Sequence, residues 1–123
     1  NNALKVQPAS TEALYNRGLY FQNKGEVGKA AADYNAILKI DPKYSDAYFN
    51  LGYINSVLSA NYKEAVKYYS EAIRIDDQYA EAFFNRGVCY EKLGDKAAAQ
   101  KDFTSTLSIS PAYKAAADKL KRK

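Results

Sequence analysis

The sequence contains no histidine, no tryptophan and no methionine, and its only cysteine is Cys89. Without histidine the chain cannot build a Ser-His-Asp or Cys-His site, and it lacks both the commonest general base and a frequent zinc ligand. A single cysteine excludes an intramolecular disulfide and a multi-cysteine metal site. These absences argue against an enzyme, and we expect neither a metal nor another cofactor.

Long apolar runs are also missing. No stretch approaches the roughly 18 apolar residues of a membrane helix. The first ten residues lack the basic and then apolar layout of a secretion signal. Because the first residue is Asn, we expect a chain that has been processed or cut from a longer one. A soluble protein is expected. Its compartment is left open, with the cytoplasm preferred.

The net charge of +4 suggests nucleic acid until the charges are located. Five of the 18 basic residues lie in residues 114–123, where Asp118 is the single acid, so residues 1–113 carry no net charge. We therefore expect neither nucleic acid nor a membrane as a partner. Residues 114–123 are interpreted as a solvated, basic helix end.

The chain does contain a repeat with a period of 34 or 35 residues. Small residues recur at this spacing, and so do an aromatic residue and a helix-ending residue. The sets are Gly18, Gly52 and Gly87; Ala30, Ala65 and Ala99; Tyr34, Tyr69 and Phe103; and Pro8, Pro42 and Pro111, with Asp77 in the remaining slot. The middle unit has one extra residue between Gly52 and Ala65, where "SVLSAN" replaces a shorter turn. Periods of 20 to 50 residues indicate stacked repeats.

These residues resemble the tetratricopeptide repeat (TPR) family. The matching positions are Leu14, Arg17, Gly18, Phe21, Ala30, Tyr34 and Pro42 in the first unit, Tyr48, Leu51, Gly52, Asn55, Ala65 and Tyr69 in the second, and Phe83, Arg86, Gly87, Tyr90, Ala99, Phe103 and Pro111 in the third. The sequence departs from the family at Arg17 and Arg86, where leucine is usual, at Asn55, where an aromatic is usual, and at Asp77, where proline is usual.

The resemblance implies an all-α fold, a right-handed superhelical solenoid of antiparallel helix pairs. We expect three TPR units at 11–44, 45–79 and 80–113, followed by a C-terminal capping helix and basic tip at 114–123. Residues 1–10 are expected to be a remnant of a preceding repeat or a leader. A helical hairpin exposes an apolar face until a neighbour covers it, so the units should depend on stacking.

The residues support this interpretation independently of the family. Helical periodicity covers roughly residues 11–24 and 27–40 in the first unit. Gly25 and Gly94 suit the left-handed conformation that ends a helix, and Asn61 is the expected residue for this role in the middle unit. The recurring Gly and Ala residues should let paired helices approach closely.

Solenoids of this kind use the first helix of each pair to line a concave surface. Counting along the helix from each Gly predicts one face in each unit. Its residues are Glu12, Tyr15, Asn16 and Leu19; Asp46, Phe49, Asn50 and Tyr53; and Glu81, Phe84, Asn85 and Val88. The rings of Tyr15, Phe49 and Phe84 are expected to lie outside the core of the helix pair. The sequence thus predicts a peptide-binding groove.

An asparagine row is the most specific feature of this face. The carboxamides of Asn16, Asn50 and Asn85 match the donors and acceptors of a peptide bond, and some tetratricopeptide proteins hold peptides with such a row. The alternative is that each Asn bonds within its own repeat or faces water. Because a hydrogen bond nets only about 1 kcal/mol, the rings must supply most of the affinity, which is expected on the order of micromolar.

Other family members bind the acidic tails of chaperones through a two-carboxylate clamp. Of the five clamp positions only Asn50 matches, whereas Tyr15, Leu19, Glu81 and Asn85 depart. Glu12, Asp46 and Glu81 would repel a carboxylate tail, so the expected partner is a protein or peptide with Lys or Arg beside apolar residues, and not a chaperone tail.

Several alternatives stay open. The chain is interpreted as a non-enzymatic interaction module, with a self-assembling segment of a longer array or an accessory domain of a larger enzyme as alternatives. Cys89 is either a buried apolar residue or a reactive thiol. Asp76 and Asp77 are either helix caps or solvated groups, or else metal ligands.

Overall fold

The computed structural model of the chain describes residues 10–121. The helices are α2 (Thr11–Asn23), α3 (Val27–Ile40), α4 (Ser45–Tyr53), the π-helical segment η2 (Ile54–Leu58), α5 (Tyr62–Ile75), α6 (Ala80–Leu93), α7 (Lys96–Ile109) and α8 (Lys114–Lys121). Within these residues there is no strand. The expected remnant at 1–10 lies, apart from Ser10, outside the described residues.

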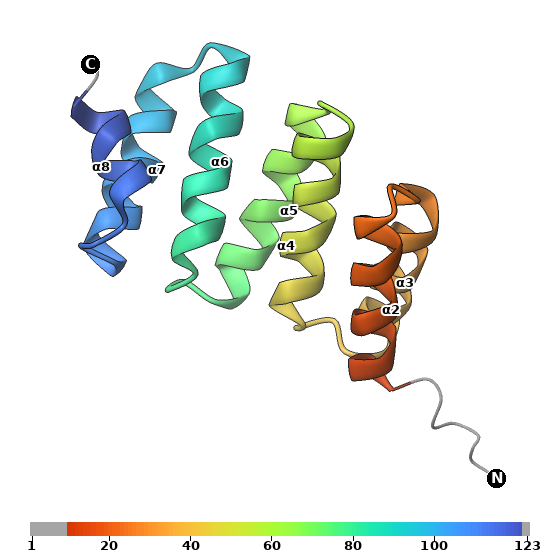
Figure 1. Ribbon diagram of the computed structural model, residues 1–123. Helices are drawn as coiled ribbons and strands as arrows, with labels where there is room; N and C mark the ends of the chain where they lie inside the picture. Colours follow the sequence, from red (N-terminus) through yellow and green to blue (C-terminus); the bar gives the residue numbers. More distant parts are fainter. Residues whose placement is uncertain (1–9, 122–123) are drawn as a thin grey trace, which may run out of the picture.

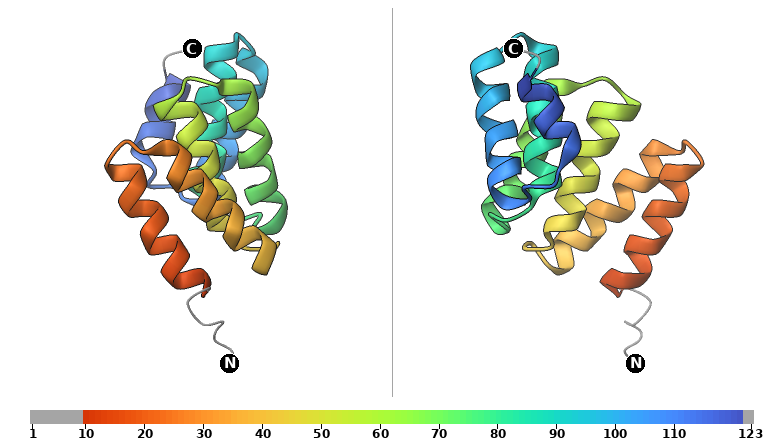
Figure 2. Two further views of the ribbon diagram at one scale, coloured as in Figure 1. Left: turned by 90° about the vertical axis from the view of Figure 1, so that its right-hand side faces the viewer. Right: turned by 60° about the vertical axis from the view of Figure 1, so that its left-hand side comes forward.

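The helices form successive pairs. Helix α2 packs on α3, α4 on α5 and α6 on α7, while α5 also packs on α6 and α8 packs on α7 (Figure 1). The views in Figure 2 show that the pairs are tilted relative to one another along the row. The predicted all-α helical repeat solenoid is therefore confirmed.

Local sequence explains where the helices begin and end. The Ser10 hydroxyl accepts a hydrogen bond from the Ala13 amide at 3.1 Å and so caps α2. Helix α3 ends two residues before Pro42, and α7 ends two residues before Pro111. Proline disfavours helical geometry in the residue before it, so the chain must turn at these points.

Each repeated Gly is covered by the repeated ring of the second helix. A Cβ atom added to Gly18 would lie 2.7 Å from Cε1 of Tyr34, and the same distance would separate Gly52 from Tyr69 and Gly87 from Phe103. These rings are fully buried. Glycine at this position is what allows the ring to lie against the first helix, as the sequence predicts.

The turn inside the middle pair differs from the prediction. Gly25 and Gly94 take left-handed conformations, with φ of 82° and 87°. In the middle pair the left-handed residue is Ala60, with φ of 53°, whereas Asn61 has φ of −97°. Helix η2 accommodates the extra residue, so the left-handed conformation falls on Ala60, one residue before Asn61. The expectation for Asn61 is therefore wrong.

Candidate peptide-binding surface

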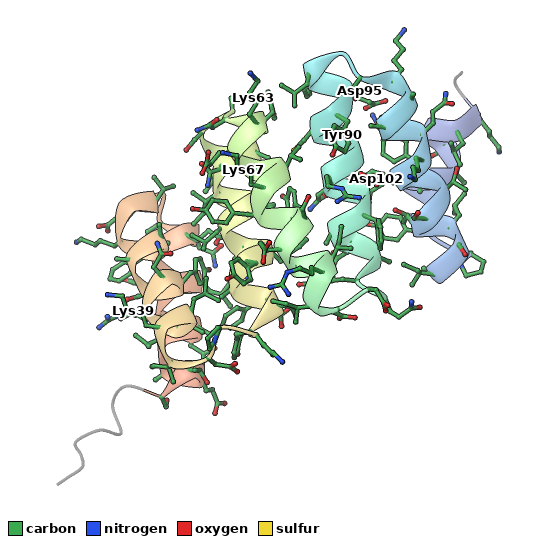
Figure 3. The ribbon with its side chains drawn as sticks, turned by 180° about the vertical axis from the view of Figure 1, so that it is seen from behind. Lys39, Lys63, Lys67, Tyr90, Asp95 and Asp102 are labelled. Atoms are coloured by element: carbon green, nitrogen blue, oxygen red, sulfur yellow. The ribbon has the colours of Figure 1, made fainter. Side chains whose placement is uncertain are left out.

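The first helices and the second helices form separate layers. Helices α2, α4 and α6 face the viewer in Figure 1, and α3, α5 and α7 lie behind them. Figure 3 shows the opposite side, where Lys39 of α3 and Lys63 and Lys67 of α5 are exposed. We call the side formed by α2, α4 and α6 the first-helix face. All residues predicted to contact a peptide belong to its helices.

The predicted rings of this face pack more deeply than expected. Tyr15, Phe49 and Phe84 are half-buried and contact the core. Their ring centroids lie 6.0 Å from Tyr34, 5.5 Å from Tyr69 and 5.5 Å from Phe103, respectively. The expectation that these rings lie outside the core of the helix pair is wrong, because the second-helix ring that covers the Gly also reaches the side of the first-helix ring.

A third ring per repeat was missed. Tyr44, Tyr79 and Tyr113 come from the loops that follow the second helices, and their centroids lie 5.8, 5.0 and 5.2 Å from Tyr15, Phe49 and Phe84. Each first-helix ring is thus held between two others. The signal was present in the sequence, because these tyrosines recur with the same 34- or 35-residue spacing as the glycines. Such contacts stabilise each pair by about 1 kcal/mol beyond area burial.

Carboxylates surround the loop tyrosines. Glu12, Asp46 and Glu81 are exposed and lie in the first turns of α2, α4 and α6. Burial raises the pKa of the Tyr79 phenol, and its hydrogen bond to the Asp46 carboxylate raises that pKa further. Burial likewise raises the pKa of Tyr15, partly offset by a hydrogen bond from Asn50. The phenols are therefore neutral around pH 7. The charge at these helix starts comes from the carboxylates and is negative.

The three asparagines have different environments. Asn16 is exposed and Asn85 is half-buried. Asn50 is only 6% exposed, and its Nδ2 group donates to the Tyr15 hydroxyl at 2.8 Å and to the Asp46 carbonyl at 3.0 Å. Asn50 thus links the first two repeats internally, whereas Asn16 and Asn85 have accessible surface. Leu19 and Tyr53, the other predicted contacts, are half-buried. Contact of any of these residues with a ligand stays a prediction.

An open cavity lies between the end of the second repeat's first helix and α6. Its volume is about 230 Å³. Asn85, Val88, Cys89 and Lys92 line it from α6, and Ser56, Val57 and Tyr62 line it from η2 and α5. Burial raises the pKa of Cys89 to about 11, so the thiol is protonated at neutral pH. This result favours the buried, apolar interpretation of Cys89 over the reactive one.

No group of His, Cys, Asp and Glu residues within residues 10–121 is arranged to hold a metal ion. Over the same range, none of the helices is long and apolar enough to cross a membrane. Asp76 follows the last residue of α5, and its carboxylate accepts a hydrogen bond from the Gln78 amide at 3.1 Å. This carboxylate therefore has a role in the turn.

Sequence models of the tetratricopeptide repeat match residues 11–44, 80–113 and 34–67, and a model described as TPR repeat matches residues 61–94. The chain belongs to the tetratricopeptide repeat family. Among curated protein sequences, none matches the chain significantly.

Solved structures of several proteins resemble this chain over about nine-tenths of its length. The first TPR of Spaghetti (RPAP3), bound to the HSP90 peptide SRMEEVD, has a TM-score of 0.85 at 20% identity and covers 91% of this chain and 88% of its own. The Arabidopsis OM64 TPR domain has a TM-score of 0.84 at 24% identity, covering 91% and 92%. MamA has a TM-score of 0.81 at 26% identity, covering 92% of this chain and 66% of its own.

In a second MamA structure the share covered is 61%, so this chain spans less than two thirds of the length of the MamA chains it resembles. The fold itself is typical of protein–protein interaction modules, and the RPAP3 structure is one with its peptide in place.

The two arginines that depart from the tetratricopeptide pattern form ion pairs that the sequence analysis missed. Arg17 binds Asp33 and Arg86 binds Asp102, each through two hydrogen bonds of 2.7–2.9 Å. Both carboxylates are buried, and Figure 3 shows Asp102 on α7. In the middle repeat the same two positions are Leu51 and Tyr68. The joint exchange of Arg and Asp for Leu and Tyr in the middle repeat was a signal for pairing that the sequence already contained.

Proposed function

We propose that the chain is a non-enzymatic protein-interaction module that binds an extended peptide, or a helix, on the first-helix face. The observation that supports this proposal best is the repetition of one surface three times. In every repeat a half-buried ring on the first helix lies beside a loop tyrosine and near an exposed carboxylate. A peptide that crosses the repeats would meet the same chemistry at each one.

The charges of this surface favour a ligand that contains Lys or Arg. The first turns of α2, α4 and α6 each carry one acid on this face, namely Glu12, Asp46 and Glu81. Each repeat therefore offers a ring near a carboxylate. Cations are attracted both to carboxylates and to aromatic faces. An acidic peptide would be repelled. Chaperone tails such as SRMEEVD, which the RPAP3 domain binds, are therefore not the proposed ligand class.

The role of the asparagines is proposed to be unequal. Asn16 is exposed and Asn85 is half-buried at the open cavity, whereas the amide hydrogens of Asn50 already have acceptors inside the protein. We therefore expect Asn16 and Asn85 to bind the backbone of the ligand. Asn50 is expected to hold Tyr15 in place, so that the Tyr15 ring can contact the side chains of the ligand. The rings, together with Leu19 and Tyr53, would bury the apolar part of the ligand.

A paired titration tests the proposal. Fluorescein-labelled SRMEEVD would be compared with the same peptide carrying lysine at its three acidic positions, using fluorescence anisotropy. The basic peptide should bind more tightly. Replacing Glu12→Gln and Glu81→Gln together should weaken its binding about two- to fivefold, because exposed ion pairs contribute under about 1 kcal/mol each.

The matched control is Glu64→Gln with Glu71→Gln on α5, which removes the same charge from a helix of the other layer. This variant should bind as the wild type does. Stronger binding of SRMEEVD than of its lysine counterpart would contradict the proposed ligand class.

A second candidate function is assembly with a further helical pair. Arg86 donates not only to Asp102 but also to Ser70 of the preceding pair at 3.0 Å, and its side chain is 19% exposed. Arg17 makes the matching pair with Asp33, yet its side chain is 61% exposed, and the nearby Tyr20 is 56% exposed. A further helical pair packed on α2 would cover the Arg17 and Tyr20 side chains.

Light scattering tests this second candidate function. It should detect concentration-dependent oligomers that Tyr20→Glu abolishes, and a monomer at all concentrations would contradict assembly.

A further inference from the structure

The extra residue of the middle repeat changes the geometry of its turn. In the outer repeats a backbone hydrogen bond spans five residues, from the Glu26 amide to the Phe21 carbonyl and from the Asp95 amide to the Tyr90 carbonyl, both at 2.9 Å. In the middle repeat the bond spans six residues, from the Asn61 amide to the Asn55 carbonyl at 2.6 Å. The insertion is thus accommodated by a wider, π-helical turn.

The wide turn leaves apolar side chains on the surface. Val57 and Leu58 of η2 are 56% and 43% exposed, although both are large and apolar. The 230 Å³ cavity lies beside them, between η2 and α6. We call this cavity the π-turn pocket. A cavity of roughly 150 Å³ is enough for a benzene ring, so the π-turn pocket has room for one large side chain and not for a helix.

The lining of the π-turn pocket selects the chemistry of its occupant. The walls formed by Val57, Val88 and the Tyr62 ring are largely apolar, and Cys89 adds a small apolar group. The Ser56 hydroxyl is hydrogen-bonded to the Tyr69 hydroxyl at 3.0 Å, so it is already engaged. These walls suit an apolar side chain.

Lys92 is the one charged residue among those that line the π-turn pocket. Asn85 offers a carboxamide and Lys92 offers an ammonium group, and no acidic residue lines the cavity. Within residues 10–121, no carboxylate lies within 4.0 Å of the Lys92 ammonium. The pocket therefore complements an apolar side chain that has a carboxylate nearby, whereas the starts of α2, α4 and α6 complement a cation.

We propose that the π-turn pocket receives one leucine, methionine or phenylalanine side chain of the bound peptide, with the adjacent carbonyl on Asn85 and a neighbouring Asp or Glu on Lys92. The inference rests on the proposed peptide-binding function and adds direction to it. Lys92 and Glu81 are eleven residues apart on α6, which is about 16 Å along the helix. An extended ligand that reaches both side chains should carry its basic residue at least about five positions from its acidic one.

The sequence allows the wide turn to be removed without substituting any residue that lines the π-turn pocket. Gly18 to Gly25 and Gly87 to Gly94 are each seven residues apart, while Gly52 to Ala60 is eight. Deletion of Ser59 combined with Ala60→Gly gives the middle repeat the turn length and left-handed glycine of the others. We call this the short-turn variant. The matched control is Ala60→Gly alone, which keeps the extra residue.

The test uses decapeptides enriched on the wild-type protein from a random phage-displayed library, made synthetically and labelled with fluorescein. Their dissociation constants are measured by anisotropy, and folding of each variant is checked by circular dichroism. We expect the enriched peptides to share a large apolar residue beside an acid, to bind the short-turn variant at least tenfold more weakly, and to bind Ala60→Gly within twofold of the wild type. Lys92→Gln should weaken binding of these peptides about threefold.

A ligand-side measurement keeps the test valid if the short-turn variant does not fold. Replacing the shared apolar residue of the peptide with alanine should also weaken binding at least tenfold, and the wild-type peptide should shift the methyl resonances of Val57 and Val88. Enriched peptides that leave both methyl groups unmoved, or that bind a folded short-turn variant as tightly as the wild type, would overturn the pocket while leaving peptide binding intact. Failure to enrich any peptide would instead contradict the proposed function.

Discussion

At the scale of single residues, similar side chains at equivalent positions have different roles because their neighbours differ. Asn16, Asn50 and Asn85 occupy one position of the repeat, yet only Asn50 is buried and bonded to both the first and second repeats. Arg17 and Arg86 make the same ion pair, yet only Arg86 also reaches the preceding helix pair. A repeat therefore supplies positions, and stacking determines which of them stabilise the fold.

Replacing Asn50→Ala should destabilise the protein by about 1–3 kcal/mol. The change removes the donor to the Tyr15 hydroxyl in a partly buried site, while the Asp46 carbonyl keeps the backbone hydrogen bond of the helix. Asn16→Ala is the control, and it should change the unfolding free energy by less than about 0.5 kcal/mol because Asn16 is exposed. Urea unfolding followed by circular dichroism measures both. Equal stabilities of the two variants would contradict the internal role of Asn50.

The Arg86–Asp102 pair gives a second prediction. Arg86→Leu alone should cost about 3 kcal/mol, because it leaves a carboxylate that is 3% exposed without its partner. Adding Asp102→Tyr reproduces the residue types of the middle repeat, Leu51 and Tyr68, and should recover most of the loss. The interaction energy from a double-mutant cycle checks this. Additive losses in the two single variants would show that the residues act independently.

At the scale of elements, the turns within the helix pairs separate the middle repeat from its neighbours. Gly25 and Gly94 take the left-handed conformation without a steric penalty, whereas Ala60 takes it with a Cβ atom. Helix η2 adds a π-helical segment immediately before this turn. The middle turn is thus a strained element whose wide geometry forms one wall of the π-turn pocket.

The strain at Ala60 can be measured. Ala60→Gly should raise the unfolding free energy by about 0.5–1 kcal/mol, because relief of a penalty of about 1–2 kcal/mol exceeds the entropy that glycine adds to the unfolded chain. Gly94→Ala is the opposite change at an equivalent turn and should destabilise the protein by about 1 kcal/mol. A lower melting temperature for Ala60→Gly would show that Ala60 carries no strain.

The sequence predicts elements better than it predicts contacts. Spacing alone located the three helix pairs, the turn glycines and the insertion, because each depends on a local backbone requirement. The left-handed residue of the middle turn was assigned to Asn61 and not to Ala60, since residue preference ignored the shift caused by the insertion. The burial of Tyr15, Phe49 and Phe84 was also missed, because the covering tyrosines come from the loop between two repeats.

The same limit applies to the candidate site. The first-helix positions follow from counting along a helix, but the internal partners of Asn50 depend on how α4 sits against α2. Predicting the π-turn pocket would have required the backbone path of η2, which the residue types in "SVLSAN" do not specify. What the sequence did contain, and what was overlooked, are the spaced loop tyrosines and the joint exchange of Arg and Asp for Leu and Tyr.

At the scale of the whole molecule, the core holds phenols and a thiol in their neutral forms. Burial is the largest cause of the raised pKa of Tyr15, Tyr34, Tyr69, Tyr79 and Cys89. An unfolded chain would release these protons at lower pH than the folded one. Between the ordinary pKa and the raised pKa the folded state therefore binds more protons, and the unfolding free energy falls as pH rises.

Stability should accordingly be constant from about pH 7 to 8 and should fall from about pH 9 upward, with the contribution of Cys89 lost by about pH 11 and that of the tyrosines still falling above it. Cys89→Ala removes one of these groups, so its melting temperature should fall less steeply over the same range. Thermal melts at half-unit pH steps check both slopes. A wild-type melting temperature that does not fall above pH 9, or a Cys89→Ala slope equal to that of the wild type, would contradict this account.

The repeated units also define two faces with different charge. Carboxylates mark the starts of α2, α4 and α6, while Lys39, Lys63 and Lys67 lie on the side formed by α3 and α5 (Figure 3). A basic peptide is expected on the first-helix face alone. We propose that peptide binding belongs to this one layer of the solenoid.

Chemical-shift mapping tests that claim most directly. The lysine-substituted counterpart of SRMEEVD would be titrated into isotope-labelled protein, and backbone and side-chain amide shifts would be followed for both layers. We predict saturable shifts at Asn16, Leu19, Asn85 and Val88, and none above noise at Lys39, Lys63 and Lys67. Shifts concentrated on the three lysines, or no saturable shift at any of the seven residues, would contradict the account.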